Sequence, residues 1–392
     1  MRSVVIAGGA IAGLSAAREL RRAGFPGRIQ VVDQDRRGPY RRPEVSKGLL
    51  EGRLGLDSVA TPWPADLNVD RILGVRLTGL DLAARTVQVE GGAVPFDGLV
   101  IATGCAARRS PYEAMAGVHT LRSADDAERM RPELAAAMKI VIVGAGFIGL
   151  EVASVARKLG KSVTLLEAAE IPLARVLGDD FGEHIAGTHR AHGVDLRTGV
   201  TVAGVTAGAS GRVSSVELTS GETVAADVVL VAIGSEPATG WLRDSGLDLS
   251  MGVVCDETCA VADGVVAAGD VASWINPLYR RRMRVEHWTN AVEQGAYAAR
   301  RLMGTHDPTG FASVPYFWSD QYGVKLQCVG STLDHDQYAV LDDSDGRFLV
   351  AYGRAGRLVC VAGMNAGAAV MKHRALVLRA VPLAEVAAAS RT

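Results

Sequence analysis

Two glycine-rich segments of the chain have the residue types and spacing that hold a dinucleotide. The first reads Gly-Gly-Ala-Ile-Ala-Gly at residues 8–13, and the second reads Gly-Ala-Gly-Phe-Ile-Gly at residues 144–149. In such a segment one glycine permits a tight turn after a strand, a second lets the backbone approach a pyrophosphate, and a third lets a helix pack closely. The amides and the dipole at the helix N-terminus favour the anion. The second segment is complete, whereas Ala10 adds a methyl group at the middle position of the first.

An acidic residue follows each segment, where a carboxylate can accept hydrogen bonds from ribose hydroxyls. Glu167 ends the strand expected after the second segment, and two alanines follow it. A carboxylate there repels a 2′-phosphate, and neither alanine can hold one, so this position favours NADH over NADPH. After the first segment the acid is either Asp33 or Asp35. One such segment alone indicates only a tight strand–helix turn, but two, each with its acid, indicate two dinucleotide sites.

The elements around these segments repeat along the chain. Apolar residues 3–7 and 139–143 predict buried strands, and each is followed by a glycine turn, a helix and another strand. Gly8 and Gly144 lie 136 residues apart, so the sequence contains an internal duplication of a βαβ unit. This alternation predicts an α/β fold with two Rossmann-like domains. Residues 311–392 read instead as short strands, hairpin turns and a helix, which predicts a small α+β domain.

Two further turns made of small residues follow predicted strands. Ala102, Thr103 and Gly104 form one turn, and Gly269 with Asp270 forms the other. A carboxylate directly after a glycine at such a turn could bond the ribityl hydroxyls of a flavin. Each turn alone is equally compatible with ordinary loop chemistry.

Three longer segments carry a more specific pattern. They read PYRRPEVSK at residues 39–47, RVEHWTNAVEQG at 284–295 and PYFWSDQ at 315–321. With them the sequence resembles the FAD-dependent NADH:ferredoxin reductases of cytochrome P-450 and aromatic-ring dioxygenase systems, over essentially the whole chain. The resemblance implies an FAD-binding domain at 1–107 and 236–310, an NAD-binding domain at 108–235 and a C-terminal interface domain at 311–392.

The resemblance also implies roles for individual residues. Lys47 matches a lysine beside the flavin N5 that pairs with the carboxylate at Glu151, and Trp318 matches an aromatic residue beside the isoalloxazine. Ala10 and the acid after the second strand depart from the family pattern, in which that acid often stands at the position of Gln34. The residues expected to contact FAD or NADH are Gly8, Ala10, Ile11, Ala12, Gly13, Asp33, Asp35, Arg42, Lys47, Ala102, Thr103, Gly104, Arg108, Gly144, Gly146, Phe147, Ile148, Gly149, Glu151, Glu167, Gly234, Gly269, Asp270, Glu286, His287, Trp288 and Trp318.

The activity that the resemblance implies is electron transfer from NADH, the substrate, through a tightly bound FAD to a ferredoxin. NADH delivers a hydride, which carries two electrons, whereas an iron–sulfur ferredoxin accepts one at a time, and a flavin converts between the two. Ferredoxins are typically acidic, so the basic run Arg280–Arg282 is a candidate docking site. A solvated loop explains the same run equally well.

Two other functions remain open on the sequence alone. One is an NADH oxidase or disulfide reductase of the same superfamily, although the first hundred residues contain no cysteine to relay electrons. The other is a redox-sensing flavoprotein similar in fold to apoptosis-inducing factor, which predicts long insertions or tails that this compact chain does not have.

Composition sets the remaining expectations. Lys and Arg total 42 against 43 Asp and Glu, a net charge of -1, which disfavours a nucleic-acid partner. Five cysteines occur without a CxxC pair, which fits a reducing compartment, and no cluster of metal ligands stands out. Without a recognisable signal peptide or membrane span, the chain is expected to be cytoplasmic, with no membrane partner, as a monomer or weak homodimer.

Overall fold

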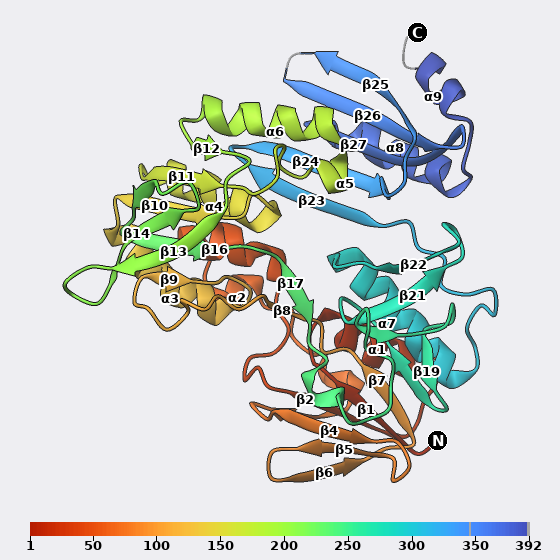
Figure 1. Ribbon diagram of the computed structural model, residues 1–392. Coiled ribbons are helices and arrows are strands. Elements are labelled where there is room, and N and C mark those ends of the chain that lie inside the picture. The colour runs from red at the N-terminus through yellow and green to blue at the C-terminus, as the bar shows by residue number, and fades with distance from the viewer. Residues whose placement is uncertain (345, 390–392) are drawn as a thin grey trace. The chain divides into compact units, whose positions relative to one another are not determined.

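The computed structural model describes residues 1–344 and 346–389. The chain divides into two compact units, each assembled from three separate stretches (Figure 1). Unit 1 comprises Met1–Arg41, Val59–Ala106 and Glu236–Pro315. Unit 2 comprises Arg42–Ser58, Ala107–Ser235 and the residues from Tyr316 onward.

A six-stranded sheet in the order β19-β20-β7-β1-β2-β3 forms the centre of unit 1. The five strands from β20 to β3 are parallel, and β19 is antiparallel to β20. Sequence order reverses between β1 and β7, and ligands of open α/β sheets bind at the carboxyl ends of strands at such a switch point. The strands are β1 (Ser3–Ala7), β2 (Arg28–Asp33), β3 (Val69–Leu73), β7 (Gly98–Ile101), β19 (Ala260–Ala262) and β20 (Val265–Ala267).

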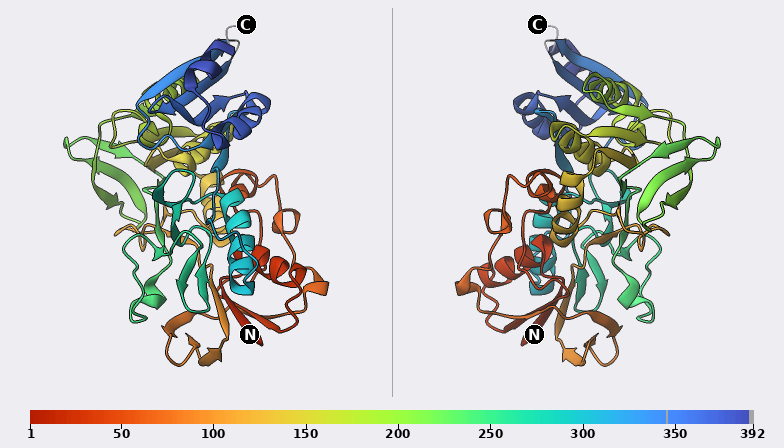
Figure 2. Two further views of the ribbon diagram at one scale, coloured as in Figure 1. Left: turned by 90° about the vertical axis from the view of Figure 1, so that its right-hand side faces the viewer. Right: turned by 90° about the vertical axis from the view of Figure 1, so that its left-hand side faces the viewer.

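Two helices cover one face of this sheet. Helices α1 (Ile11–Arg22) and α7 (Trp288–Met303) lie side by side, red and cyan in Figure 2. A Cβ at Gly295 of α7 would lie 2.3 Å from the carbonyl oxygen of Ala12, so this close approach depends on glycine. Apolar side chains of β1, β7 and β20 line both faces of the sheet, which is the pattern of a parallel sheet buried on both sides.

Unit 2 contains a second parallel sheet built on the same plan. Its order is β12-β11-β10-β16-β9, with the switch point between β10 and β16. Strand β10 (Lys139–Val143) and helix α4 (Phe147–Lys158) are the counterparts of β1 and α1. The other elements are β9 (Val118–His119), α3 (Ala124–Ala136), β11 (Ser162–Leu166), α5 (Ala174–Leu177), α6 (Asp179–Ala191), β12 (Asp195–Arg197) and β16 (Val228–Val231).

The C-terminal part of unit 2 is an antiparallel sheet followed by two helices, drawn in blue in Figure 1. On its first strand, Phe317, Ser319 and Gln321 are buried, whereas Trp318 is partly exposed and Asp320 exposed, so alternate residues face the interior. In the order β23-β24-β27-β26-β25, the strands are β23 (Tyr316–Gln321), β24 (Val324–Gly330), β27 (Arg357–Met364), β26 (Arg347–Arg354) and β25 (Gln337–Ser344), and the helices are α8 (Gly367–Leu378) and α9 (Leu383–Ala389).

Smaller elements complete the fold. No helix in the described part of the chain combines the length and the apolar character needed to cross a membrane. The predicted α/β fold with a small α+β end is confirmed. The remaining elements are η1 (Arg42–Glu44), η2 (Val45–Leu49), α2 (Leu56–Val59), η3 (Ala65–Leu67), β4 (Leu77–Asp81), β5 (Thr86–Val89), β6 (Gly92–Pro95), β8 (Cys105–Ala107), β13 (Val202–Ala207), β14 (Val213–Leu218), β15 (Thr223–Ala225), β17 (Ser235–Pro237), η4 (Gly240–Leu242), β18 (Val253–Val254), β21 (Ala272–Asn276) and β22 (Arg281–Arg284).

None of the five cysteines is in a disulfide, and they differ in burial. Burial raises the pKa of Cys255 to about 12 and raises the pKa of Cys259 and Cys360 well above that of an ordinary thiol, and Cys328 is also buried. The thiolate is the reactive form, so we expect no more than one thiol per native chain, Cys105, to react with an aromatic disulfide reagent at neutral pH. All five should react after denaturation. Fast labelling of several thiols in native protein, or of one thiol in Cys105→Ser, would contradict this expectation.

Candidate active site

Four loops meet at the carboxyl edge of the unit 1 sheet, after β1, β2, β7 and β20. Gly8, directly after β1, has a φ of +106°, and a Cβ there would lie 2.3 Å from the carbonyl oxygen of Ala102 after β7. A Cβ at Gly13 would lie 2.1 Å from the Gly8 carbonyl oxygen. Both positions therefore require glycine, as the sequence pattern predicts. Residues 10–12 between them form the N-cap and first turn of α1.

The two helix N-termini that follow the glycine turns have no side-chain cap. The N-cap of α1 is Ala10 and that of α4 is Gly146, and neither provides a side-chain hydrogen bond to the first turn. A Cβ at Gly146 would meet nothing within 4 Å among the described residues, so the space before α4 is open. Free backbone N–H groups facing such a space suit a pyrophosphate.

The acids after the two glycine turns are bonded in the same way. The Asp33 carboxylate accepts the Gly9 amide at 2.5 Å and the Asp35 amide at 2.8 Å. The Glu167 carboxylate accepts the Ala145 amide at 2.6 Å and the Ala169 amide at 2.9 Å. In each case the carboxylate is held beside the turn that would carry the pyrophosphate. Asp33 is therefore the geometric counterpart of Glu167 in the duplicated unit.

Asp35 is bonded differently. Its carboxylate accepts the amide of Arg37 at 2.9 Å, within its own loop, and not an amide of the glycine turn. Sequence spacing alone left Asp33 and Asp35 as alternatives, and the hydrogen bonds separate them.

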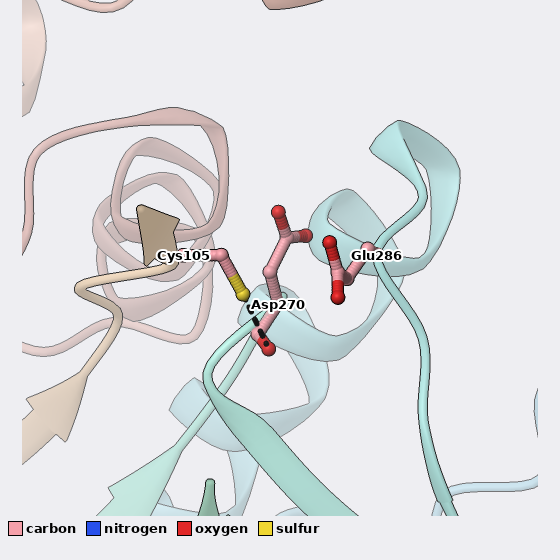
Figure 3. Close-up of side chains that lie close together, drawn as sticks. All are labelled: Cys105, Asp270 and Glu286. Atoms are coloured by element: carbon pink, nitrogen blue, oxygen red, sulfur yellow. Dashed lines mark hydrogen bonds between the residues drawn. The ribbon is translucent and has the colours of Figure 1, made fainter. Parts of the chain in front are cut away.

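The loop after β20 places Asp270 in a cluster of ionisable groups. Figure 3 shows Cys105, Asp270 and Glu286 close together, with ligand-type atoms within 4.8 Å of one another. Arg284 enters this cluster: its Nη1 lies 2.7 Å from Glu286 Oε1 and 3.1 Å from Cys105 Sγ. Because the Arg284 guanidinium already pairs with Glu286 and donates to the Asp270 carbonyl oxygen, the cluster is better explained as a hydrogen-bonded wall of the site than as a metal centre. Gly269, just before Asp270, has a φ of +77°.

The N-terminus of α7 adds a buried polar atom to the same region. Asn290 is 1% exposed, and its Oδ1 has no hydrogen-bond partner among the described residues. Its Nδ2 lies 3.3 Å from Gln294 Oε1, which accepts the Gly269 amide at 2.9 Å. A buried polar atom without a partner points to a bound polar group. The predicted residues His287 and Trp288 form the N-cap and first residue of this helix.

The glycine turn of unit 2 reproduces the geometry of unit 1. Gly144 has a φ of +102°, and a Cβ there would lie 2.5 Å from the Ala232 carbonyl oxygen. A Cβ at Gly149 would lie 2.0 Å from the Gly144 carbonyl oxygen. Gly234 follows β16 with a φ of +101°, as Gly104 follows β7 with a φ of +70°. The duplication inferred from sequence is therefore structural, and Phe147 and Ile148 open the helix α4.

A buried ion pair in unit 2 joins Lys47 to Glu151. Lys47 Nζ lies 2.7 Å from Glu151 Oε1, and the two side chains are 13% and 6% exposed. Lys47 stands in the π-helix η2, an element that is frequent at functional sites, and its backbone leaves helical values at φ -121° and ψ -108°. Ser46 Oγ also donates to the carboxylate, and Ser319 Oγ does so at 2.6 Å. The pairing of Lys47 with Glu151 is therefore present.

The other predicted residues of unit 2 lie at its surface or bind backbone. Arg42 donates from Nη1 to the Arg122 carbonyl oxygen at 3.1 Å, and Arg108 is exposed. Trp318 is partly exposed and stacks on Tyr316, with ring centroids 5.9 Å apart. In unit 1, Thr103 Oγ1 donates to a backbone carbonyl at 2.9 Å.

Comparison with known proteins identifies the family. Residues 2–295 match the profile described as pyridine nucleotide-disulphide oxidoreductase, and residues 316–392 match the one described as reductase C-terminal. The chain belongs to the pyridine nucleotide-disulphide oxidoreductase family. It is 36% identical to the 5,5'-dehydrodivanillate O-demethylase ferredoxin reductase subunit of a Sphingobium species, over 95% of this chain and 92% of that one. It is also 36% identical to rhodocoxin reductase of Rhodococcus erythropolis, over 97% and 90%.

A solved structure supports the same placement. The covalent putidaredoxin reductase–putidaredoxin complex contains a chain that matches with a TM-score of 0.93 and 31% identity, over 100% of this chain and 99% of that chain. The resemblance inferred from the three sequence segments is therefore confirmed.

Sequence reasoning missed several residues of this oxidoreductase site. Ser46 and Ser319 donate hydrogen bonds to the Glu151 carboxylate. They come from segments far apart in the sequence, and no spacing rule joins them. Arg282 was considered for docking, yet its Nη1 donates to the carbonyl oxygens of Cys255 and Ser273 at 2.9 and 2.8 Å. Its guanidinium is therefore used to hold unit 1 together.

Proposed function

We infer that this chain is an FAD-dependent NADH:ferredoxin oxidoreductase of the kind that serves cytochrome P-450 and ring-hydroxylating dioxygenase systems. The duplicated dinucleotide geometry carries this conclusion. Each parallel sheet presents a glycine turn, an uncapped helix N-terminus and a carboxylate bonded to a turn amide. One chain can then hold a donor and an acceptor of a hydride. The sequence similarity to ferredoxin reductases, which extends over nearly the full length of this chain and of those proteins, supports an iron–sulfur ferredoxin as the final electron acceptor.

The two cofactors are assigned to different parts of the chain. Residues 1–107 and 236–310 would bind FAD tightly, and residues 108–235 would bind NADH. Residues 311–392 would form the domain that faces the ferredoxin. The uncapped α1 N-terminus and the Asn290 Oδ1 atom fit the FAD, with Asp33 on its ribose and Asp270 on its ribityl chain. Glu167 holds the ribose of NADH. Free thiols agree with a cytoplasmic location.

The chain's own groups would act on the reaction through charge and position. FAD, when bound, accepts a hydride from NADH and releases the two electrons singly. Lys47 would supply a positive charge near N5 of the bound flavin, and Glu151 holds that ammonium at 2.7 Å. The N-terminus of α7 adds the positive end of a helix dipole, which favours negative charge. Trp318 is assigned to the path toward ferredoxin.

Steady-state NADH oxidation tests this function. The holoprotein is assayed with NADH alone and with a plant- or adrenodoxin-type [2Fe–2S] ferredoxin added. We expect slow turnover with oxygen and strong stimulation by the ferredoxin. Turnover that is fast with oxygen or with a small disulfide, and indifferent to every ferredoxin tried, would instead support the NADH oxidase or disulfide reductase alternative.

Asp33 and Asp35 give a matched pair for testing the FAD assignment. Asp33→Ala should raise the Kd for FAD about tenfold, because a charged acceptor for the ribose hydroxyls is lost. Asp35→Ala should have little effect, because Asp35 accepts only the amide of Arg37 among the hydrogen bonds described for its carboxylate. Fluorescence titration of apoprotein with FAD measures both. The reverse order of effects would show that the ribose lies beside Asp35.

The proposed ferredoxin is acidic, and the first two arginines of the basic run, exposed Arg280 and partly exposed Arg281, test this. An Arg280→Ala/Arg281→Ala double variant should raise the KM for ferredoxin roughly fivefold at low salt, because it removes charges that steer association. Reduction of FAD by NADH should be unchanged. Arg282→Ala serves as the contrast, since it removes two backbone hydrogen bonds and should lower thermal stability. An unchanged KM in the double variant would make this run a solvated loop.

A further inference from the structure

A continuous polar chain lies behind the Lys47–Glu151 ion pair, within unit 2. Ser319 Oγ lies 2.6 Å from Glu151 Oε1, Gln321 Nε2 lies 3.0 Å from Ser319 Oγ, and Gln321 Oε1 lies 2.8 Å from His189 Nε2. The chain continues from His189 Nδ1 to the hydroxyl of Tyr322 at 3.2 Å. It links the glutamate of α4 to the last turn of helix α6 through strand β23.

Every member of this chain can donate in the same direction. The Ser319 hydroxyl donates to the carboxylate, which can only accept, so its oxygen is left to accept from the Gln321 amide N–H. Gln321 then offers its carbonyl oxygen to His189, which must donate from Nε2. His189 Nδ1 is left to accept from the Tyr322 hydroxyl. All four donors therefore point toward Glu151.

The surroundings make this arrangement costly to disturb. His189 and Ser319 are 0% exposed and Gln321 is 5% exposed, so each polar atom depends on its neighbour in the chain. Burial lowers the pKa of His189 to about 4, so its ring is neutral at pH 7 and keeps one donor and one acceptor nitrogen. Tyr322 ends the chain near solvent, stacked on His192 with ring centroids 3.9 Å apart.

The packing of strand β23 explains why the polar chain reaches Glu151. Ser319 and Gln321 alternate with outward residues on β23, and Phe317 on the same face packs against Phe147 of α4 at 4.8 Å between ring centroids. The inward face of β23 is thus held against the helix that bears Glu151. Ser319, the residue of this polar chain that bonds Glu151, directly follows Trp318 in the sequence.

We propose that Ser319, Gln321 and His189 are positioning residues that hold the Glu151 carboxylate, and through it the Lys47 ammonium, in the geometry needed for hydride transfer. The proposal rests on the function inferred above. The chain prevents the carboxylate from turning away from Lys47, because Oε1 is shared between the ammonium and the Ser319 hydroxyl. A displacement of about 1 Å at such a group is enough to slow a reaction strongly.

Stopped-flow reduction of the bound FAD by NADH tests the proposal. Ser319→Ala and Gln321→Leu should each slow this step about tenfold, the loss that one buried hydrogen bond represents. Ser319→Thr, which keeps the hydroxyl, should restore most of the rate, and the KM for ferredoxin should stay unchanged. Ser154→Ala is the matched control: Ser154 lies one turn after Glu151 and accepts only the Tyr322 amide at 2.8 Å among the bonds described for it. Its rate should equal that of the wild type.

Two measurements separate a positioning role from a structural one. In a Glu151→Gln background, Ser319→Ala should produce no further slowing of FAD reduction, although each change still lowers the thermal midpoint.

Independently of activity, nitrogen NMR of histidine-labelled protein should show His189 protonated on Nε2 alone, and this tautomer population should fall in Gln321→Leu. Equal slowing by Ser319→Ala and Ser154→Ala, additive effects with Glu151→Gln, or protonation of His189 on Nδ1 would overturn the proposal. If NADH fails to reduce FAD in the wild type, the proposed function is refuted, whereas the NMR result on His189 is unaffected.

Discussion

Wild-type protein is expected to reduce its FAD with NADH about a hundredfold more efficiently, in kcat/KM, than with NADPH, and Glu167→Ala should abolish most of that preference. The Glu167 carboxylate is fixed by two backbone amides, at 2.6 and 2.9 Å, beside the glycine turn of unit 2. A fixed charge there repels a 2′-phosphate and retains free lone pairs for the ribose hydroxyls.

The matched control for this preference is the Glu170→Ala variant. Glu170 is an acidic residue three positions further along the chain and has no part in the proposed site. It removes a nearby negative charge but leaves the two amide bonds of Glu167 in place. Both variants are compared with the wild type in NADH- and NADPH-dependent reduction of FAD. An unchanged NADH preference in Glu167→Ala, or an equal loss in Glu170→Ala, would show that general charge and not the fixed carboxylate sets the choice.

The second large effect concerns the buried ion pair. Glu151→Leu should slow FAD reduction by NADH about a hundredfold, because it leaves the Lys47 ammonium, only 13% exposed, without its counter-ion. Adding Lys47→Met to Glu151→Leu should cost little more activity, because both residues act as one unit.

An ion pair with one exposed partner, between the same two parts of the chain, is the control. Glu51 pairs with Lys158, a residue of α4 whose side chain is 63% exposed. The hydrogen bond from Lys158 lowers the pKa of Glu51, so the pair is charged at neutral pH, but solvent-exposed pairs contribute at most about 1 kcal/mol. Glu51→Gln should therefore leave the rate of FAD reduction unchanged. Equal effects of Glu51→Gln and Glu151→Leu would contradict the special role of the buried pair.

The parts of the site that were predictable from sequence are those set by local rules. Each glycine turn requires a positive φ or a close backbone approach at a defined spacing, which is why Gly8 and Gly144 could be placed without coordinates. Strand β10 was predicted with its observed bounds, because a run of buried apolar residues between a charged residue and a glycine leaves little choice. Glu167 was predicted as the last residue of the next strand, whereas β11 ends at Leu166 and Glu167 directly follows it.

The rest depends on contacts between distant segments. Spacing could not distinguish Asp33 from Asp35, because what distinguishes them is a hydrogen bond from an amide of the glycine turn, which follows another strand. Ser319 reaches Glu151 only because β23 packs on α4, a tertiary contact that periodicity does not encode. The sequence suggested that Arg282 is a surface charge, whereas the side chain is partly buried and donates to two backbone carbonyl oxygens of unit 1.

The central claim is that one chain takes hydride from NADH and delivers single electrons to an iron–sulfur protein. Its most direct test is an anaerobic titration of a catalytic amount of holoprotein with NADH in the presence of excess oxidised [2Fe–2S] ferredoxin, followed by absorbance. Two ferredoxins should be reduced for each NADH consumed, with one proton released, until NADH is exhausted. NADH consumption that stops after the bound FAD is reduced, with the ferredoxin still oxidised, would contradict the account.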